Sequence, residues 1–200
     1  MKKAKRPPAA RARQRRLAWL RVPAEEEIPG KVRALWKVPR QRLGFVPNVF
    51  RIFALRPQHL IRWWAYYDDL LRGPSNLTKV QREMIAVVVS ALNRCRYCMT
   101  THSAALRLLT NDARLADRLL RDYRSAPLDR RERAMLDFAV RLTTASHRCT
   151  EADVRALRRA GWTDEDIMDI AEVAAMFNYT NRLANALGWV PNPEYQTLGR

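Results

Sequence analysis

The sequence predicts an all-α protein built as a single helical domain. Three observations predict it. Apolar residues recur at helical spacing, Thr and Asp residues stand where helix N-caps are preferred, and no stretch alternates apolar and polar residues as a strand would. The chain has 200 residues, of which 48% are hydrophobic and only six are glycine. This length and composition suit one domain with a sizeable core and exclude a fibrous chain.

The first helices are expected on either side of Pro57. Asn48 is a candidate N-cap for a short helix that carries Phe50 and Phe53, and Pro57 ends or redirects that helix. A second helix, rich in Trp, Tyr and Leu, closes at the Gly73-Pro74 pair. Its aromatic residues surround the helix too completely for one buried face. We therefore expect it to pack both inside the domain and against another subunit.

The clearest helix start lies at Thr78. Gln81 stands three residues later, at the spacing of a capping box, and the helix that follows runs to about Leu92. The three consecutive valines at 87–89 also suit a buried strand, but the capping box and the length of the segment favour a helix. Asn93 then either breaks this helix or caps the next one.

The second half of the chain repeats the pattern of capped, amphipathic helices. Three are predicted from their ends: one opened by Asp129 or Leu128, one from Thr150 to Gly161, and one from Thr163 to Gly188.

The positive charge is concentrated at the N-terminus. Lysine and arginine number 37 against 20 acidic residues, a formal charge of +17, and nine of the basic residues but no acid lie between Met1 and Ala24. We predict a basic, flexible tail over residues 1–24 and the domain over residues 25–200. Such a tail suits nonspecific contact with nucleic acid or anionic lipid. It is also Arg-rich like an organelle transit sequence but lacks the usual serines.

Cysteine usage and hydropathy point to a cytoplasmic protein. Three cysteines in 200 residues cannot form the disulfide framework of a small secreted domain. No apolar run reaches the length of a membrane span, so no membrane partner is expected. The glycines are scattered singly, so no phosphate-binding loop is predicted and no cofactor is expected.

Reactive residue types converge at Cys95, Cys98 and His102. On a helix these three share one face, because they are three and four residues apart. A helix N-terminus lowers the pKa of a cysteine thiol, and Arg94 and Arg96 are expected to act in the same direction. A second thiol one turn away can capture an oxidised sulfur as a disulfide. The pattern predicts dithiol redox chemistry.

Glu83 is the fourth candidate site residue. It lies on the preceding helix, on the flank that a turn near Asn93 would fold back onto the Cys–His face, where a carboxylate can orient His102 or accept a proton. The alternative is a solvated glutamate in the first turn of its helix, favoured by the helix dipole.

Zinc binding is the chemical alternative to redox activity, since Cys and His are zinc ligands. A structural site needs four ligands, and the two other histidines, His59 and His147, have no neighbouring ligand pair apart from Cys149 beside His147. A second alternative is a non-enzymatic module that binds nucleic acid through its tail or senses oxidants and keeps the cysteine pair as a vestige.

The residues from Glu83 through Ser90 to Cys95, Cys98 and His102 resemble the alkylhydroperoxidase D and carboxymuconolactone decarboxylase superfamily, in particular its peroxidase-related branch. In that family a glutamate stands twelve residues before the first cysteine, as Glu83 does before Cys95. The segments 44–48 and 177–182 also look like that branch. The resemblance covers roughly residues 44–194.

The resemblance implies a thiol-dependent peroxidase. Cys98 would be the peroxidatic cysteine, Cys95 the resolving cysteine, and Glu83 and His102 the proton relay. The implied substrates are hydrogen peroxide or small organic hydroperoxides, and the implied reductant is a thioredoxin-like or lipoyl-bearing protein. Tyr97 is a departure, because alkylhydroperoxidase D proper has a histidine before its second cysteine. Family members are trimers or hexamers, and the decarboxylases of the superfamily lack the cysteine pair.

Overall fold

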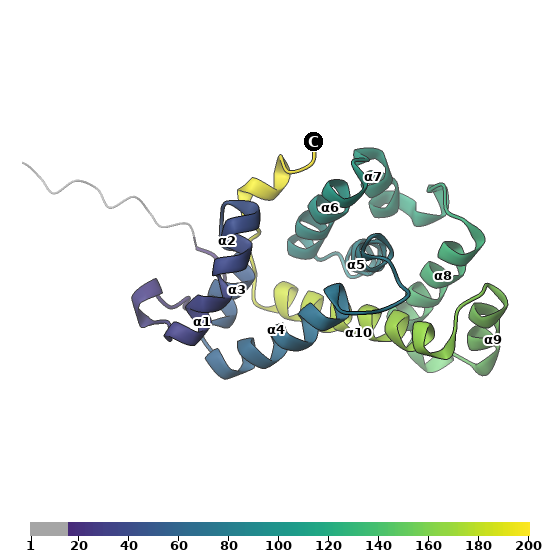
Figure 1. Cartoon of the computed structure of the whole chain (residues 1–200), viewed down its shortest axis with the longest axis horizontal. Helices are drawn as coiled ribbons and strands as arrows, with labels where there is room; N and C mark the ends of the chain where they lie inside the picture. The colour runs from purple at the N-terminus through teal and green to yellow at the C-terminus, as the bar shows by residue number, and fades with distance from the viewer. Residues whose placement is uncertain (1–15) are drawn as a thin grey trace, which may run out of the picture.

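Helix α5 (Lys79–Leu92) runs through the centre of the computed structural model, which describes residues 16–200 (Figure 1). The other helices are α1 (Gly30–Leu35), α2 (Lys37–Leu43), α3 (Asn48–Phe53), α4 (Pro57–Arg72), α6 (Arg96–Thr110), α7 (Ala113–Asp122), α8 (Arg130–Ala145), α9 (Glu151–Arg159) and α10 (Asp164–Ala186). Short 3-10 helices are η1 (Glu25–Glu27), η2 (Tyr123–Ser125), η3 (Ser146–Arg148) and η4 (Pro193–Gln196). No strand occurs within residues 16–200, and the all-α prediction is confirmed.

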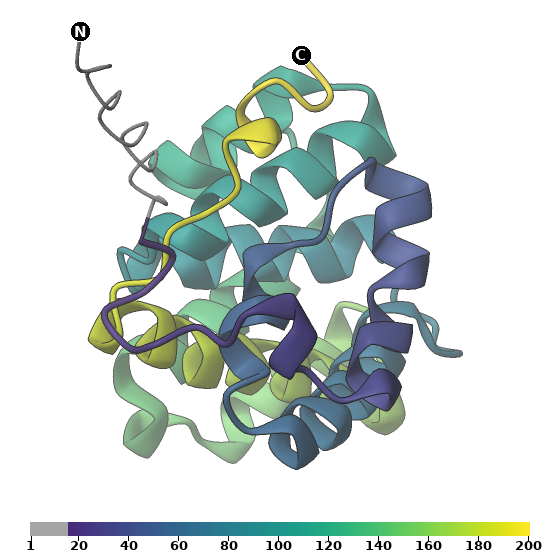
Figure 2. The ribbon, with the colours of Figure 1, turned by 90° about the vertical axis from the view of Figure 1, so that its left-hand side faces the viewer.

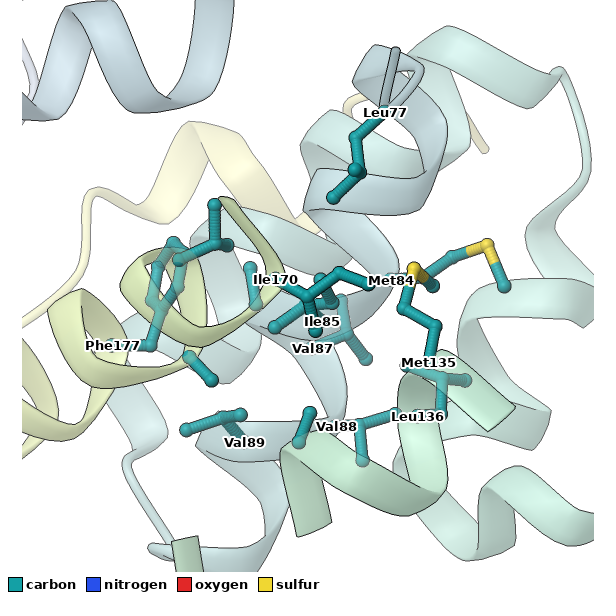
Figure 3. Close-up of a cluster of buried hydrophobic side chains, with 14 of the residues drawn as sticks. Leu77, Met84, Ile85, Val87, Val88, Val89, Met135, Leu136, Ile170 and Phe177 are labelled. Carbon is teal, nitrogen blue, oxygen red and sulfur yellow. The ribbon is translucent and has the colours of Figure 1, made fainter. Parts of the chain in front are cut away.

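Helix α5 is central because its middle is apolar on every side. The residues from Met84 to Val89 are each at most 2% exposed. Figure 3 shows their side chains between those of α8 and α10. A helix that is apolar all round must be enclosed by others, and each large aliphatic side chain buried here contributes roughly 1.5–3 kcal/mol. The valines at 87–89 therefore belong to a helix, as predicted.

The predicted caps are present at the starts of four helices. Thr78 and Gln81 form a reciprocal capping box at α5, and Asp129 with Glu132 does the same at α8. Thr150 immediately precedes α9, and Thr163 caps α10. Each box satisfies backbone N–H groups that have no partner inside the helix.

The cap expected at Asn48 is wrong, and Asn93 follows the first of its two predicted roles. Asn48 is the first residue of α3, and Pro47 occupies the cap position. The Asn48 amide instead donates to the carbonyl of Val190, so its side chain joins distant segments. Asn93 ends α5, and the N-cap of α6 is Cys95.

Part of the predicted tail packs on the domain. Residues 1–15 lie outside the described part of the chain. The next segment packs on the domain: Ala18 is 1% exposed, the Trp19 N–H donates to the Leu187 carbonyl, and the Val190 N–H donates to the Leu17 carbonyl. Figure 2 shows this segment beside the chain that follows α10. The domain therefore begins before the predicted boundary at Glu25.

The aromatic belt of α4 is covered largely by this same chain. Tyr67 is buried, and Trp63 and Trp64 are half-buried against the core. Tyr66 is exposed and donates to a carboxylate oxygen of Glu172. The belt therefore does not require a second subunit, and oligomerisation stays a prediction.

No helix among residues 16–200 is long and apolar enough to cross a membrane.

Candidate active site

Glu83 and His102 meet at the buried boundary between α5 and α6. His102 Nδ1 lies 2.7 Å from Glu83 Oε2, and the two residues are 9% and 8% exposed. The chain turns tightly between the two helices, with Arg94 in the left-handed region at φ 51°. This turn brings the Glu83 carboxylate onto the Cys–His face, so Glu83 is not the solvated first-turn residue of the alternative interpretation.

The carboxylate fixes how His102 is presented. A neutral histidine beside a carboxylate carries its proton on the nitrogen that faces the carboxylate, so Nδ1–H donates to Glu83. Nε2 is the ring nitrogen not held by Glu83, and the His102 ring lines a cavity. Phe177 holds the ring edge-on, with centroids 4.5 Å apart. The pair therefore presents a histidine in a fixed position at the cavity wall.

Cys95 and Cys98 lie at the start of α6. Cys95 caps the helix through its sulfur, which accepts the Cys98 backbone N–H at 3.5 Å. Cys95 is fully buried and Cys98 is 4% exposed, and both thiols are free. Cys98 lines the same cavity as His102, whereas Cys95 lies behind it. Of the pair, Cys98 is the sulfur that a molecule in the cavity meets.

The two thiols ionise unequally. The pKa of Cys95 is lowered to about 7, mainly because the Cys98 thiol donates to its sulfur. The Cys98 N–H, His102 and the Tyr97 N–H lower it further, and burial acts in the opposite direction. Donation to Cys95, together with burial, raises the pKa of Cys98 well above its usual value. Arg94 and Arg96 are not among the main causes and line a different hollow. When the cysteine pair loses its first proton, the negative charge therefore remains on Cys95.

The cavity beside Cys98 has a volume of about 190 Å³ and aromatic walls. These walls come from α3, α4, α6, α10 and the segment after α10; they include Phe50, Trp63, Trp64, Tyr67, Tyr97, Phe177, Trp189 and Tyr195. Its volume is below the range typical of sites for drug-sized ligands. The cavity suits a small, partly apolar molecule.

Two tryptophans that line this cavity, Trp63 and Trp189, have buried indole nitrogens that make no hydrogen bond among residues 16–200. The pKa values of Tyr67 and Tyr195 are raised by burial and by the nearby Glu83 carboxylate, so both phenols keep their protons. The aromatic residues of the wall thus bring uncharged polar groups as well as apolar surface.

Thr180 and Asn181 of α10 are site residues that the sequence reasoning missed. Both lower the pKa of the Cys98 thiol and so partly offset its rise. The Asn181 amide is fully buried and also links to Ser90 and Asn93, which ties α10 to the end of α5. In the sequence, the only indication of their role is that they lie in segment 177–182, which looks like the peroxidase-related branch.

Tyr97, which replaces the histidine of the resemblance, forms part of the cavity wall. Its hydroxyl accepts the Val49 N–H at 2.9 Å, and its ring packs edge-on against Trp189. Burial raises its pKa well above the usual value. Tyr97 therefore anchors α3 over the cavity. A histidine at this position would instead add a titratable ring beside Cys98.

The remaining thiol and the zinc alternative lie apart from this cavity. Cys149 is partly exposed, just before α9, and does not line the cavity. Among the described residues no group of three or more His, Cys, Asp or Glu side chains gathers as metal ligands would. The geometry gives zinc no site in this part of the chain.

A sequence model of the carboxymuconolactone decarboxylase family matches residues 57–114 and 112–191, which together make up more than half of the chain. The chain belongs to this family. The matched residues include Cys95 and Cys98. No curated protein matches significantly.

Two solved members of similar length are peroxidase-related proteins. One, from Silicibacter sp. TM1040, is 43% identical, with a TM-score of 0.90 and coverage of 94% of this chain and 99% of that one. The other, an uncharacterized protein with an alkylhydroperoxidase AhpD core from Ralstonia eutropha JMP134, is 42% identical, with a TM-score of 0.89 and coverage of 92% and 97%.

A debrominase solved in complex with 2,3,4-tribromopyrrole shares the fold, with a TM-score of 0.76 and 17% identity over 88% of this chain and 93% of that one. At this identity the similarity concerns the fold alone.

Proposed function

We propose that this member of the carboxymuconolactone decarboxylase family is a thiol-dependent peroxidase. The observation that carries the proposal is the Glu83–His102 pair at the wall of a small cavity that also holds Cys98. A peroxidatic site needs a thiol, a proton acceptor beside it and a second thiol within reach. The peroxidase-related description of two relatives above 40% identity also supports it.

Cys98 is the nucleophile in this proposal. Its S–H donates to the Cys95 sulfur, so proton transfer to that sulfur creates the Cys98 thiolate at the cavity wall. The thiolate attacks the terminal oxygen of a hydroperoxide and the O–O bond breaks. The leaving alkoxide takes up a proton relayed through His102 from the Cys95 thiol, which returns Cys95 to the thiolate. Cys98 is then a sulfenic acid.

Cys95 completes the cycle as the resolving cysteine. Its thiolate attacks the Cys98 sulfur, the S–O bond breaks, and hydroxide leaves and is protonated to water. Two thiols and one hydroperoxide thus give one disulfide, one alcohol and one water. A dithiol protein of the thioredoxin-like or lipoyl-bearing class restores the thiols by exchange.

The aromatic wall favours a small organic hydroperoxide over hydrogen peroxide. A ring or alkyl chain gains free energy from apolar contact, at roughly 25 cal/mol per Å² buried. We expect cumene hydroperoxide to oxidise the protein faster than hydrogen peroxide does.

The test uses fully reduced protein without added reductant. Wild type is expected to consume one cumene hydroperoxide per chain and to lose two hydrogen atoms in mass. Cys95→Ser is expected to gain one oxygen at Cys98, and Cys98→Ser to react at least about 100-fold more slowly. Cys149→Ser is the matched control and should behave as wild type. Peroxide consumption that survives in Cys98→Ser, or is absent in wild type, contradicts the proposal.

A further inference from the structure

A second hollow opens on the face of α6 opposite the cysteine cavity. Its volume is about 590 Å³. From α6 it is lined by Arg96, Met99, Thr100, Ser103 and Arg107, which recur every three or four residues and so share one face. The cavity is lined instead by Cys98, Thr101, His102, Ala105 and Leu108. We call the second site the arginine hollow; Tyr195 is the residue that lines both sites.

The arginine hollow carries an excess of positive charge. Arg94, Arg96, Arg107 and Arg200 line it, and Asp117 supplies the one acidic side chain among its lining residues. Among the ion pairs of residues 16–200, none involves these four arginines or Asp117. Residues 1–15 contain no Asp or Glu and so supply no acidic side chain.

Arg107 is built into the wall of the hollow. It is 4% exposed, and its guanidinium donates to the carbonyls of Tyr195 and Leu198, each at 3.0 Å. The pKa of Arg107 is lowered by burial and by the neighbouring Arg200 charge. The chain can press this closely on α6 because residue 199 is a glycine: a Cβ there would lie 2.8 Å from that of Arg107. The charge is thus held in a fixed place.

Ser103 supplies an unpartnered hydroxyl in the same wall. The residue is 2% exposed, and its Oγ makes no hydrogen bond within the described chain. Buried hydroxyls nearly always have a partner, so this one indicates a ligand atom or a bound water. Apolar side chains of Met99 and Leu120 lie in the lining beside these charged and polar groups.

We propose that the arginine hollow binds a small organic anion whose phosphate or carboxylate group is held by the arginines and Ser103. Arginine's planar fork matches both oxyanions, and the apolar lining suits a hydrocarbon body. The volume lies within the range of small-molecule sites. This proposal is independent of the peroxidase proposal, because neither the arginines of the hollow nor Ser103 take part in the proposed thiol reactions.

The test is calorimetric titration of the full chain with inorganic phosphate, phenyl phosphate and benzoate at constant ionic strength set with potassium chloride. Phenyl phosphate or benzoate is expected to bind with one site per chain, and phenyl phosphate at least about tenfold more tightly than inorganic phosphate. Whichever of the two organic anions binds more tightly identifies the preferred oxyanion.

Two variants and a matched control locate the binding. Arg96→Gln and Ser103→Ala are each expected to weaken binding of the preferred anion at least about fivefold. Arg118→Gln removes the same charge from an exposed position on α7 outside the hollow and should leave binding unchanged. Absence of saturable binding overturns the proposal. Equal weakening by Arg118→Gln and Arg96→Gln also overturns it, because binding would then follow net charge alone.

Discussion

The two faces of helix α6 line two sites of different character. One face places Cys98 and His102 against a cavity of about 190 Å³ with aromatic walls. The other places Arg96, Ser103 and Arg107 in a wider hollow of about 590 Å³ rich in arginine. Residues of the two faces alternate along the sequence, so only the helical period separates them.

The difference shows how the thiol pair is controlled. Sequence reasoning assigned part of the thiolate stabilisation to Arg94 and Arg96, because they flank Cys95. In the fold both arginines line the outer hollow, and the charge on Cys95 is held mainly by S–H and N–H donors at the start of α6. Neighbours in sequence need not act on one another when a helix turns them to opposite sides.

The largest effect is expected on the cavity face, from Glu83→Gln. The change keeps the size of the side chain but removes the carboxylate that fixes the His102 tautomer, so oxidation of Cys98 by cumene hydroperoxide should slow by about 100-fold. Stopped-flow measurement of the Cys98 reaction gives the rate. Glu172→Gln is the control, since Glu172 accepts from the exposed Tyr66 and should react like wild type. An unchanged rate in Glu83→Gln would remove Glu83 from the relay.

A smaller effect is expected on the ionisation of Cys95 when Cys98 is replaced. Thiolate absorbance at 240 nm should rise in wild type with a midpoint at about pH 7, because Cys95 loses its proton there. Cys98→Ala removes the main donor to Cys95, so the Cys95 pKa should rise by one unit or more toward the ordinary thiol value of about 8.5.

Cys149→Ala is the control for this titration. The pKa of Cys149 is raised by burial and by Asp153, so its loss should not alter the step near pH 7. A midpoint that stays at 7 in Cys98→Ala would assign the lowered pKa to the helix N-terminus instead.

The smallest effect is expected on the outer face, from Gly199→Ala. Gly199 has φ of 70°, and an added Cβ would meet both Arg107 and the Leu108 nitrogen. Gly161→Ala has a comparable backbone penalty at φ 95° but meets nothing within 4 Å. Gly199→Ala should make opening of residues 195–200 easier by about 1–2 kcal/mol, seen as faster amide exchange. Gly161→Ala should leave amide exchange in residues 195–200 unchanged. Equal exchange rates of this segment in both variants would show that the close contact of residue 199 with α6 matters little.

Two helix starts could be predicted from the sequence because a capping box is local. Thr78 with Gln81 and Asp129 with Glu132 are read from four residues each, and both boxes are present. Helix α7 was missed although Asp112 caps it by accepting two backbone N–H groups. Cys95 was not recognised as a cap, because sulfur is a weak acceptor outside the usual capping set.

The candidate site was predictable where it depends on two adjacent helices. Glu83 and His102 come together because α5 and α6 are joined by a tight turn, and their spacing implied it. Thr180, Asn181 and the aromatic wall come from elements distant in the sequence, and no local pattern indicates which of their residues face Cys98. The arginine hollow was missed for the same reason, since η4 and the residues after it form one of its walls.

The cavity wall also sets an order of events during synthesis. Trp189 and Tyr195 close the cavity over Cys98, and they are translated long after it. At ~5–20 residues per second, the ribosome adds them on the order of 5 to 20 s after the cysteine pair. During that interval the nascent chain holds both thiols without this part of the cavity wall. The cavity beside Cys98 can therefore be completed only after translation has passed Tyr195.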